Sequence, residues 1–372
     1  MKKQITIIGA GLSGLYAAYM LEKLGFTDYV ILEAQNNIGG RIVDYAIDDK
    51  DTTNVFDLGP SWFWPELQPQ LTDLLSELGI EHYPQFEQGD MLIERELNQK
   101  AVRLPNYQSE PESRRIHGGM GRIVHGLAKR LRTSNPILFG HAVNKISLDA
   151  ETKQLEIECQ PQPNTAPFSL HTDYVLIAMP PRLAAQSIQF EPALPKGIAQ
   201  EWLATSTWMA PHAKYFAIFE QPFWREQNLS GDGRSAIGPL VEIRDASIPN
   251  GKAALLGFFG VPGHIRKQYS AEQLTEACRE QLVRLFGPNA RAKLDVVKDW
   301  TQEKWTSIEL DEQDSGEHVR PPNAFVNNSP WAERLIGIGS EWSQRFPGYL
   351  AGAVDAADVG VKAVKTLILS DD

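Results

Sequence analysis

The sequence predicts an α/β protein in which a doubly wound sheet domain has a second, mixed α+β domain inserted into it. The first observation is a strand–turn–helix–strand pattern over residues 4–10, 13–24 and 29–34. The second is a strand at 334–339 and a long helix at 349–369, which have the character of further members of the same sheet. The sheet domain is therefore expected to be discontinuous, and pairing of 334–339 with 4–10 would support this arrangement.

The composition is that of a globular protein, with 372 residues of which 42% are hydrophobic and 22% charged. A net charge of −11 makes duplex nucleic acid a poor partner. No apolar run reaches the ~18 residues that a membrane span needs. Residues 2–8 imitate the start of a secretory signal, but the apolar run stops at Gly9. We therefore expect a buried strand there and a cytoplasmic protein.

A metal or disulfide scaffold is not expected. The two cysteines, Cys159 and Cys278, lie far apart and have no partner at metal-ligand spacing. The eight histidines form no ligand cluster, so no metal site is indicated.

The rest of the chain alternates between helical and strand patterns. The predicted elements are helices at 121–131 and 271–286, strands at 136–148, 154–158, 174–178, 215–219 and 253–259, a hairpin turn at 160–167, and a connection at 105–115. The sheet domain is expected to comprise 1–60, 115–200 and 296–372, and the substrate-binding domain 61–114 and 201–295.

A glycine motif, Gly9-x-Gly11-x-x-Gly14, directly follows the first strand and opens the first helix. The first glycine permits a tight turn, the second lets the backbone approach a pyrophosphate, and the third lets helix and strand pack closely. The helix N-terminus offers free N–H groups to a diphosphate. Glu33 ends the second strand, nineteen residues after Gly14, where an acid can bond ribose hydroxyls. The pattern predicts a Rossmann-like dinucleotide site, with a merely tight-packed turn as the alternative.

The segment Gly39-Gly40-Arg41 favours FAD over NAD as the dinucleotide. It follows Glu33 within eight residues. Two glycines and an arginine there can meet the diphosphate and flavin side of FAD, a site that a nicotinamide-dependent dehydrogenase lacks. A turn with a surface arginine is the other interpretation.

Short motifs occur in a common order over nearly the whole chain. They are the glycine motif at 9–14, Glu33, Gly39-Gly40-Arg41, Gly59-Pro60-Ser61-Trp62, Gly118-Gly119-Met120, Gly339-Ser340-Glu341, and Tyr349 within 347–353. In this order they resemble the motifs of the FAD-dependent amine oxidases, the monoamine and polyamine oxidase group.

The resemblance implies a role for each matching residue. Glu33 matches the adenosine-ribose ligand, Val143 the backbone contact to adenine, and Glu341 the acid that bonds the ribityl chain, with a surface acid as the alternative for Glu341. Arg41 and Ser340 match diphosphate or flavin contacts. The C-terminal helix would aim its N-terminus at the pyrimidine end of the flavin and stabilise the reduced ring. The other residues that the resemblance places at the cofactor are Gly9, Gly11, Ser13, Gly14, Ala34, Gly40, Gly59, Pro60, Ser61, Trp62, Trp305, Gly339, Gly348, Tyr349 and Leu350.

Lys214 and Tyr349 are the predicted catalytic residues. Lys214 stands eight residues before Pro222, which opens a Pro-Phe-Trp sequence. At this spacing the family has a lysine that holds a water against flavin N5, and an exposed strand lysine is the alternative. Tyr349 matches one wall of an aromatic cage, where aromatic faces attract the substrate nitrogen.

The chain departs from the family pattern at the other wall of this cage. Glu309 and Leu310 stand where some members carry the flavin-linking cysteine and a second tyrosine, so non-covalent FAD and an altered cage are expected. Only 58 residues lie between Gly59 and Gly118, which predicts a reduced lid. Aromatic residues that could supply the missing wall, or that simply pack in the core, are Trp62, Trp64, Trp305, Trp342 and Phe346.

The resemblance implies oxidation of an amine to an imine by hydride transfer to flavin N5, with reoxidation by O2 to H2O2. The expected partners are a small-molecule amine and O2, with no nucleic acid and no membrane, and a homodimer is left open. A carboxylate clamp for an amino acid is not visible, since residues 61–64 contain no arginine. The alternatives are a related flavoenzyme with a non-amine substrate, renalase-like or desaturase-like, and a non-catalytic FAD-binding protein.

Overall fold

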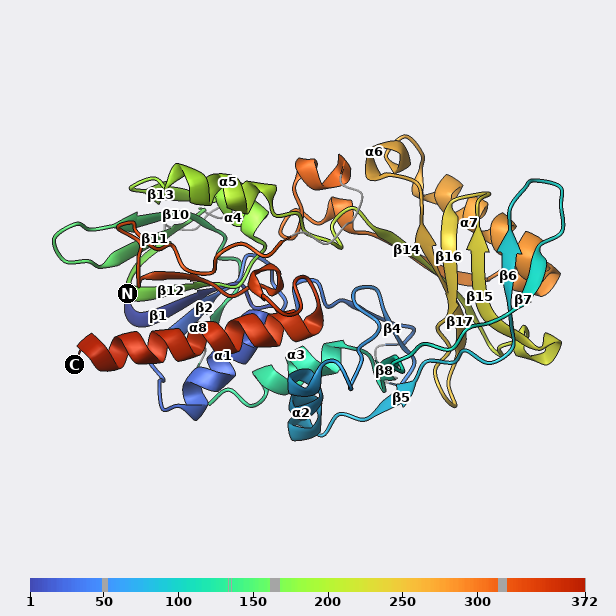
Figure 1. Cartoon of the computed structure of the whole chain (residues 1–372), viewed down its shortest axis with the longest axis horizontal. Coiled ribbons are helices and arrows are strands. Elements are labelled where there is room, and N and C mark those ends of the chain that lie inside the picture. Colours follow the sequence, from blue (N-terminus) through green and yellow to red (C-terminus); the bar gives the residue numbers. More distant parts are fainter. Residues whose placement is uncertain (49–52, 133, 135, 161–167, 314–319, 372) are drawn as a thin grey trace.

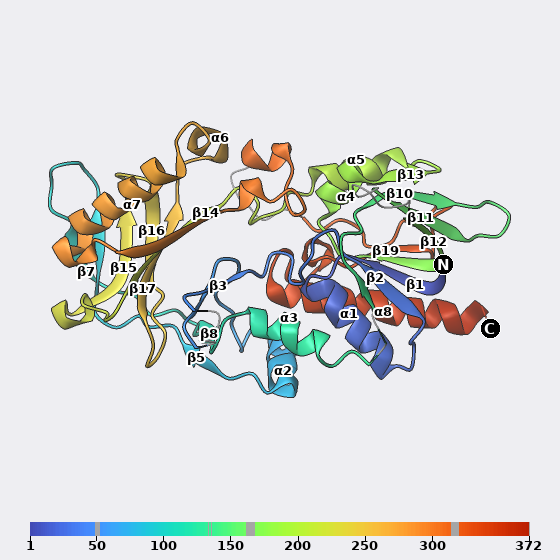
Figure 2. The ribbon, with the colours of Figure 1, turned by 180° about the vertical axis from the view of Figure 1, so that it is seen from behind.

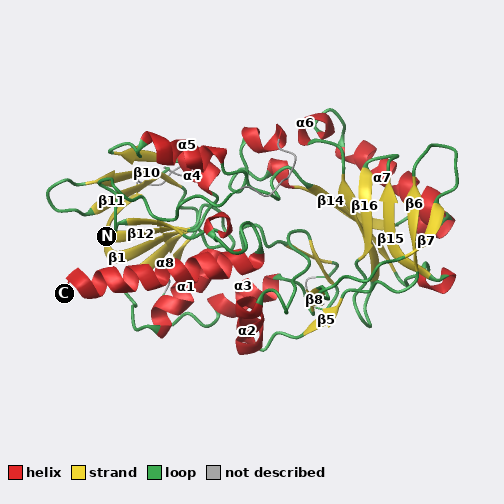
Figure 3. Cartoon of the chain, in the orientation of Figure 1, coloured by secondary structure: helices red, strands yellow, loops and turns green. Residues whose placement is uncertain are grey.

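The computed structural model describes residues 1–48, 53–132, 134, 136–160, 168–313 and 320–371. The molecule is elongated, and one large sheet lies at each end of its long axis (Figure 1). Short helices and hairpins lie between the two sheets, as Figure 3 shows. Most of the predicted hairpin turn at 160–167 lies outside the described residues, because 161–167 are not among them.

The first sheet has eight strands in the order β13-β10-β11-β12-β1-β2-β9, with β19 paired to β12. Its strands are β1 (Lys2–Ile8), β2 (Tyr29–Leu32), β9 (Ile137–Leu138), β10 (Val143–Leu148), β11 (Leu155–Cys159), β12 (Phe168–Ile177), β13 (Gln189–Glu191) and β19 (Leu335–Gly337). The strands β9, β2, β1, β12 and β19 run parallel to one another. The strand β11 runs antiparallel to both of its neighbours, β10 and β12, and β13 pairs in parallel with β10.

Helices cover both faces of the first sheet because its central strands are apolar on both sides. Ile5 and Ile7 of β1 pack in the core with one helical layer, whereas Ile8 packs in the core of the other. Figure 2 shows the two layers. One contains α1 (Leu12–Lys23), α2 (Pro69–Leu78), α3 (Gly121–Ala128) and α8 (Leu350–Asp371), and the other contains α4 (Pro181–Ser187) and α5 (Lys196–Ala204). The predicted α/β class is confirmed.

Two details of this sheet differ from the sequence predictions. The predicted strand at 136–148 is two strands, β9 and β10, because the chain turns at Gly140, where φ is 71°. The turn crosses the end of β2, and the backbone N–H of His141 donates to the carbonyl of Glu33 (2.8 Å). The strand at 334–339 joins the first sheet, but β19 pairs with β12 rather than β1, so β12 separates the two chain ends.

The second sheet has seven strands in the order β18-β14-β17-β16-β15-β6-β7. Its strands are β6 (Asp90–Glu94), β7 (Val102–Pro105), β14 (Ala213–Phe219), β15 (Leu229–Ser235), β16 (Leu240–Asp245), β17 (Ala253–Phe259) and β18 (Leu294–Asp299). The helix α7 (Ala271–Phe286) covers one face, and a capping box between Ser270 and Gln273 fixes where it begins. The predicted strands 215–219 and 253–259 are β14 and β17.

Smaller elements join the two sheets. They are the hairpin β3 (Asp44–Ala46)–β4 (Val55–Asp57), the two-stranded antiparallel sheet of β5 (His82–Pro84) and β8 (Arg114–Ile116), the helix α6 (Gly263–Arg266), and the 3₁₀ turns η1 (Arg225–Gln227), η2 (Pro288–Ala290), η3 (Trp300–Gln302), η4 (Glu309–Gln313) and η5 (Ser340–Trp342). The predicted domain boundary at 295/296 falls inside β18, and the division into two domains stays a prediction. Among the described helices, none combines the length and apolarity that crossing a bilayer requires.

Replacing Gly14 with Ala tests the close packing of α1 on β1. A Cβ at Gly14 would overlap the carbonyl oxygen of Gly9, so the helix must move. We expect a loss of about 1–3 kcal/mol in the free energy of unfolding, measured with denaturant. Gly197→Ala is the matched control, because Gly197 lies in α5 with no atom near its added Cβ and should gain about 0.5–1 kcal/mol. Equal stability of the two variants would contradict the packing argument.

Candidate active site

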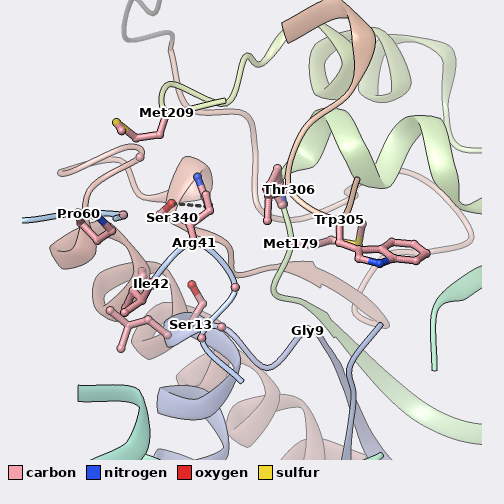
Figure 4. A pocket seen from close by; sticks show the side chains of 18 of the residues that line it. Gly9, Ser13, Arg41, Ile42, Pro60, Met179, Met209, Trp305, Thr306 and Ser340 are labelled. Atoms are coloured by element: carbon pink, nitrogen blue, oxygen red, sulfur yellow. Dashed lines mark hydrogen bonds between the residues drawn. The ribbon is translucent and has the colours of Figure 1, made fainter. Parts of the chain in front are cut away.

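A cavity of about 480 Å³ extends from the carboxyl ends of β1 and β2 to β14 and β17 of the second sheet. Figure 4 shows part of its wall, with Ser13 and Arg41 near Gly9, and Trp305 and Thr306 on the opposite side. The residues predicted from the sequence that line it are Gly9, Gly11, Ser13, Glu33, Ala34, Gly40, Arg41, Gly59, Pro60, Ser61, Trp62, Val143, Lys214, Trp305, Ser340, Gly348, Tyr349 and Leu350. Three predicted residues, Gly14, Gly339 and Glu341, do not line the cavity.

One end of the cavity lies at the glycine motif. Gly9 has a φ of 106°, which permits the turn after β1, and its N–H donates to the carbonyl of Leu32 (2.8 Å), which extends the pairing of β1 with β2. The helix α1 begins directly after Gly11, where no side chain caps it. The N–H groups of its first turn are therefore available to an anion in the cavity.

Glu33 is a buried acceptor at this same end. Its carboxylate accepts hydrogen bonds from the backbone N–H groups of Ala10 (2.7 Å) and Gln35 (2.8 Å). Burial raises the pKa of Glu33, although these two N–H groups oppose the shift. A carboxylate held in this way can still accept from hydroxyl groups of a ligand, because each oxygen has two lone pairs.

The middle of the cavity is closed by residues from both ends of the chain. Arg41 forms an ion pair with Glu341, and its guanidinium also donates to the Ser340 hydroxyl (3.1 Å). Glu341 is buried behind Arg41, so its carboxylate is reached through the arginine. The helix α8 begins just beyond, at Leu350, and this residue lines the cavity together with Gly348 and Tyr349, which directly precede the helix.

Lys214 lies at the far end on β14 and is only 1% exposed, so the alternative of an exposed strand lysine is excluded. Its ammonium nitrogen donates to the carbonyl of Gly59 and to the hydroxyl of Ser61 (3.0 Å). The rings of Trp62 and Phe258 lie 5.8 Å and 5.3 Å from this nitrogen. Burial lowers the pKa of Lys214 to about 7.

Behind Lys214 is a pair of charged residues that the sequence analysis missed. Asp57 is buried at the end of β4 and accepts from the backbone N–H of Met120 (2.6 Å). Arg115 of β8 is also buried, with its nitrogen 3.9 Å from the Asp57 carboxylate. Burial raises the pKa of Asp57 above its usual value. The signal for Asp57 in the sequence is an acid inside the otherwise apolar segment 55–58.

The aromatic side chains gather around Tyr349. Trp208, which the sequence analysis missed, lies 5.4 Å from its ring, and Trp64 meets it edge-on at 6.2 Å. His212 lines the same end, and burial lowers its pKa to about 4, so its imidazole is neutral at physiological pH.

The predicted substitutes for the missing cage wall fall into two groups. Trp62, Trp64 and Trp305 line the cavity, whereas Trp342 is buried against Trp202 and neither it nor Phe346 lines it. Glu309 and Leu310 lie on the surface turn η4, are exposed, and do not line the cavity. In the described part of the chain, no group of three or more His, Cys, Asp or Glu residues could hold a metal ion.

The sequence matches two family models. The model described as flavin containing amine oxidoreductase matches residues 92–359. Residues 7–78 match an NAD(P)-binding Rossmann-like domain. The first match covers well over half of the chain.

Individual proteins are also similar, most of those named here over nearly the whole length. A probable flavin-containing monoamine oxidase A of Dictyostelium discoideum is 23% identical over 98% of both chains. An L-amino acid dehydrogenase of Synechocystis is 26% identical over 69% of this chain and 52% of that protein. Of the solved structures, a putrescine oxidase bound to putrescine has a TM-score of 0.79 at 19% identity, covering 98% of this chain and 99% of that one. Cyclohexylamine oxidase from Brevibacterium oxydans has a TM-score of 0.78 at 20% identity over 99% of both chains.

Glu33→Gln tests the dinucleotide end of the cavity. The two oxygens of Glu33 accept from the N–H groups of Ala10 and Gln35. A glutamine side chain has one oxygen and one NH2 group, so its NH2 would face one of these N–H donors. It would also have fewer lone pairs for the hydroxyl groups of the ligand. We expect the Kd for added FAD, measured by quenching of flavin fluorescence, to rise by about 10- to 100-fold. Glu81→Gln removes the same charge from an exposed position and should leave the Kd unchanged. An unchanged Kd in Glu33→Gln would remove Glu33 from the site.

Proposed function

The chain belongs to the flavin-containing amine oxidoreductase family and is an FAD-dependent enzyme that oxidises an amine, and on this premise we propose how its own residues serve that reaction. The observation that carries the proposal is that one cavity joins the glycine motif and Glu33 to Lys214 and Tyr349. A dinucleotide end and an aromatic end in one cavity are what an extended flavin cofactor and a small substrate require.

The residues present fit FAD. A Cβ on Gly11, which lines the cavity, would have only the carbonyl oxygen of Gly39, at 3.8 Å, near it among the described residues, so the space beside this backbone is left to a ligand. The uncapped start of α1 suits the diphosphate, and Glu33 suits ribose hydroxyls. When bound, FAD supplies the acceptor for the hydride equivalent that leaves the carbon next to the amine nitrogen.

We propose that the FAD is held without a covalent bond. Glu309 and Leu310, at the family's linking region, are exposed on η4 and lie off the described cavity wall. Cys159 and Cys278 are buried away from that wall as well. Burial raises the pKa of Cys159 to about 12, so its thiol stays protonated.

Lys214 is proposed to hold a water beside the reacting ring. A neutral amine has two N–H donors and one lone pair. The two donors are used by the carbonyl of Gly59 and the hydroxyl of Ser61. The lone pair is then free to accept from a water, and a pKa of about 7 keeps this form populated at physiological pH.

The proposed substrate is an amine with an apolar body. Of the described residues that line the cavity, Glu33 and Glu242 are the acidic ones. Glu242 already pairs with Arg234 and with Arg244 (2.8 Å), so its charge is balanced and it attracts a second ammonium group only weakly. Among the described residues of the cavity wall, Lys214 and Arg41 are the cations, and Arg41 is already paired with Glu341. The wall therefore offers no unpaired arginine to a substrate carboxylate, which disfavours amino acids as substrates.

We further propose O2 as the acceptor of the flavin electrons, with H2O2 as the product, because several relatives are named oxidases. One relative is named a dehydrogenase, so an electron acceptor other than O2 is the second candidate. A cytoplasmic location and a homodimer remain part of the proposal, on the sequence alone.

The test of the proposed function is the visible spectrum of the FAD-loaded protein under anaerobic conditions. Apolar monoamines such as benzylamine and cyclohexylamine should bleach the flavin band, and admitting air should restore it with H2O2 formed. Putrescine and free amino acids should bleach it more slowly. A band that no amine bleaches would move the assignment to a non-amine substrate or to a non-catalytic protein.

Lys214→Met should separate the catalytic role of this residue from cofactor binding. We expect FAD to stay bound while flavin turnover falls about 100-fold. In the native protein, Lys214 loses its lone pair by protonation as the pH falls below about 7, so turnover should fall there. This step in the pH profile should be absent in Lys214→Met. An identical pH profile in the two proteins would exclude Lys214 as its origin.

A further inference from the structure

A second cavity of about 480 Å³ lies apart from the active-site cavity, beside the two-stranded sheet of β5 and β8. Its wall combines the segment 83–88, residues 108 and 109 from the connection between β7 and β8, Arg115, Arg225 and the turn after β16. Figure 1 shows β5 and β8 next to the lower end of the second sheet. We propose that this cavity binds a small oxyanion, a carboxylate or a phosphate, through the guanidinium of Arg115.

Arg115 is the observation that carries the proposal. It is 2% exposed, and its guanidinium makes no hydrogen bond to any of the described residues. Its contacts are the Asp57 carboxylate at 3.9 Å and the ring of Tyr83 at 5.9 Å. A guanidinium keeps its charge in proteins and carries five N–H donors. Burying such a group without acceptors is strongly unfavourable, so an acceptor must come from the cavity.

Asp57 does not supply that acceptor. Its carboxylate lies beyond hydrogen-bond distance of Arg115 and accepts from the backbone N–H of Met120 instead. Asp57 also faces the amine of Lys214 and the carboxylate of Asp44, and burial raises its pKa toward the neutral form. The positive charge of Arg115 is therefore only partly balanced from this side.

The other carboxylates around the cavity are already occupied. Glu87 accepts from the backbone N–H and the hydroxyl of Ser109. Glu112 pairs with Arg114 (2.7 Å). Asp245 accepts from Arg225 (2.9 Å) and from the indole of Trp224 (2.8 Å). Glu112 and Asp245 are thus paired with other arginines, and none of these three acids pairs with Arg115 among the residues that the structure describes. In the same part of the chain, Glu87 accepts only from neutral groups and keeps its negative charge.

The rest of the wall suits an oxyanion with a small organic body. The guanidinium of Arg225, which is paired with Asp245, stacks on the ring of Phe86, with 3.7 Å between the guanidinium carbon and the ring centre. It gives the wall a flat face but no unpaired positive charge. The Ser247 hydroxyl also lines the cavity and can donate to an anion. An oxyanion with a planar group can therefore pair with Arg115 while it contacts the aromatic wall.

The second cavity is connected to the active site by two contacts. The indole N–H of Trp62, which lines the active-site cavity, donates to Gln85 of the second cavity (2.7 Å). The positive charge of Arg115 lowers the pKa of Lys214. An anion on Arg115 would offset this effect and raise the pKa of Lys214. This consequence rests on the proposed function, whereas binding of the anion does not.

The test uses the FAD-loaded protein, in which the diphosphate site is filled. Sodium acetate and inorganic phosphate are titrated separately, at constant ionic strength set with chloride, and thermal stability and tryptophan fluorescence are measured. We expect a saturable response to one or both anions, with a Kd of about 1 mM or lower. A response to acetate alone identifies a carboxylate ligand, and one to phosphate alone identifies a phosphate ligand. No saturable response to either anion overturns the proposal.

Variants locate the site. Arg115→Met should abolish the response, whereas Arg122→Gln, at an exposed position on α3, should retain it with the same loss of charge. If Arg115→Met fails to fold, Gln108→Glu tests the site instead. Gln108 lines the cavity but is exposed, so this substitution should not disturb folding. The added negative charge should weaken anion binding about three- to fivefold, and Gln108→Lys should strengthen it. An unchanged Kd in Arg115→Met, or in both Gln108 variants, overturns the assignment.

Discussion

The active-site cavity depends on the ion pair between Arg41 and Glu341, which joins two segments 300 residues apart in the sequence. Glu341 is buried, and a buried carboxylate is stable only when its charge is paired and hydrogen-bonded. The pair joins η5, which precedes α8, to the segment after β2, and this segment lies beside the glycine motif through the Gly11–Gly39 bridge. The first and last parts of the chain must therefore both be in place before the flavin end of the site exists.

A second constraint fixes the other end of the cavity. Lys214 belongs to the second sheet, but the carbonyl of Gly59 and the hydroxyl of Ser61, which accept from it, follow the β3–β4 hairpin. Because the lysine is buried, these acceptors are required, and they hold the second sheet at a fixed position relative to the cofactor end. The same burial lowers the pKa of Lys214 to about 7, which is the property that its proposed role requires.

The sequence predicts those parts of the site that depend on local spacing. The glycine motif, Glu33 and the start of α8 are recognised because each lies at a strand or helix end with a fixed chemical requirement. Strand pairing depends on residues far apart in the sequence, so local spacing does not determine it. The sequence suggests that 334–339 pairs with 4–10, whereas β19 pairs with β12. The single strand predicted at 136–148 divides at Gly140 for the same reason, since its two halves pair with different neighbours. Arg115 was missed because only the fold brings it near Asp57.

The aromatic end shows why a family pattern can fail at one position while the chemistry is kept. Leu310 stands where some members have the second tyrosine, but it is exposed on η4 and does not line the cavity. An aromatic wall needs a ring face close to the substrate, and the sequence position that supplies it is free to change. Here the rings of Trp64 and Trp208, which also line the cavity, have centroids 6.2 Å and 5.4 Å from that of Tyr349. The aromatic surface proposed to receive an amine is therefore formed by three side chains that no contiguous motif contains.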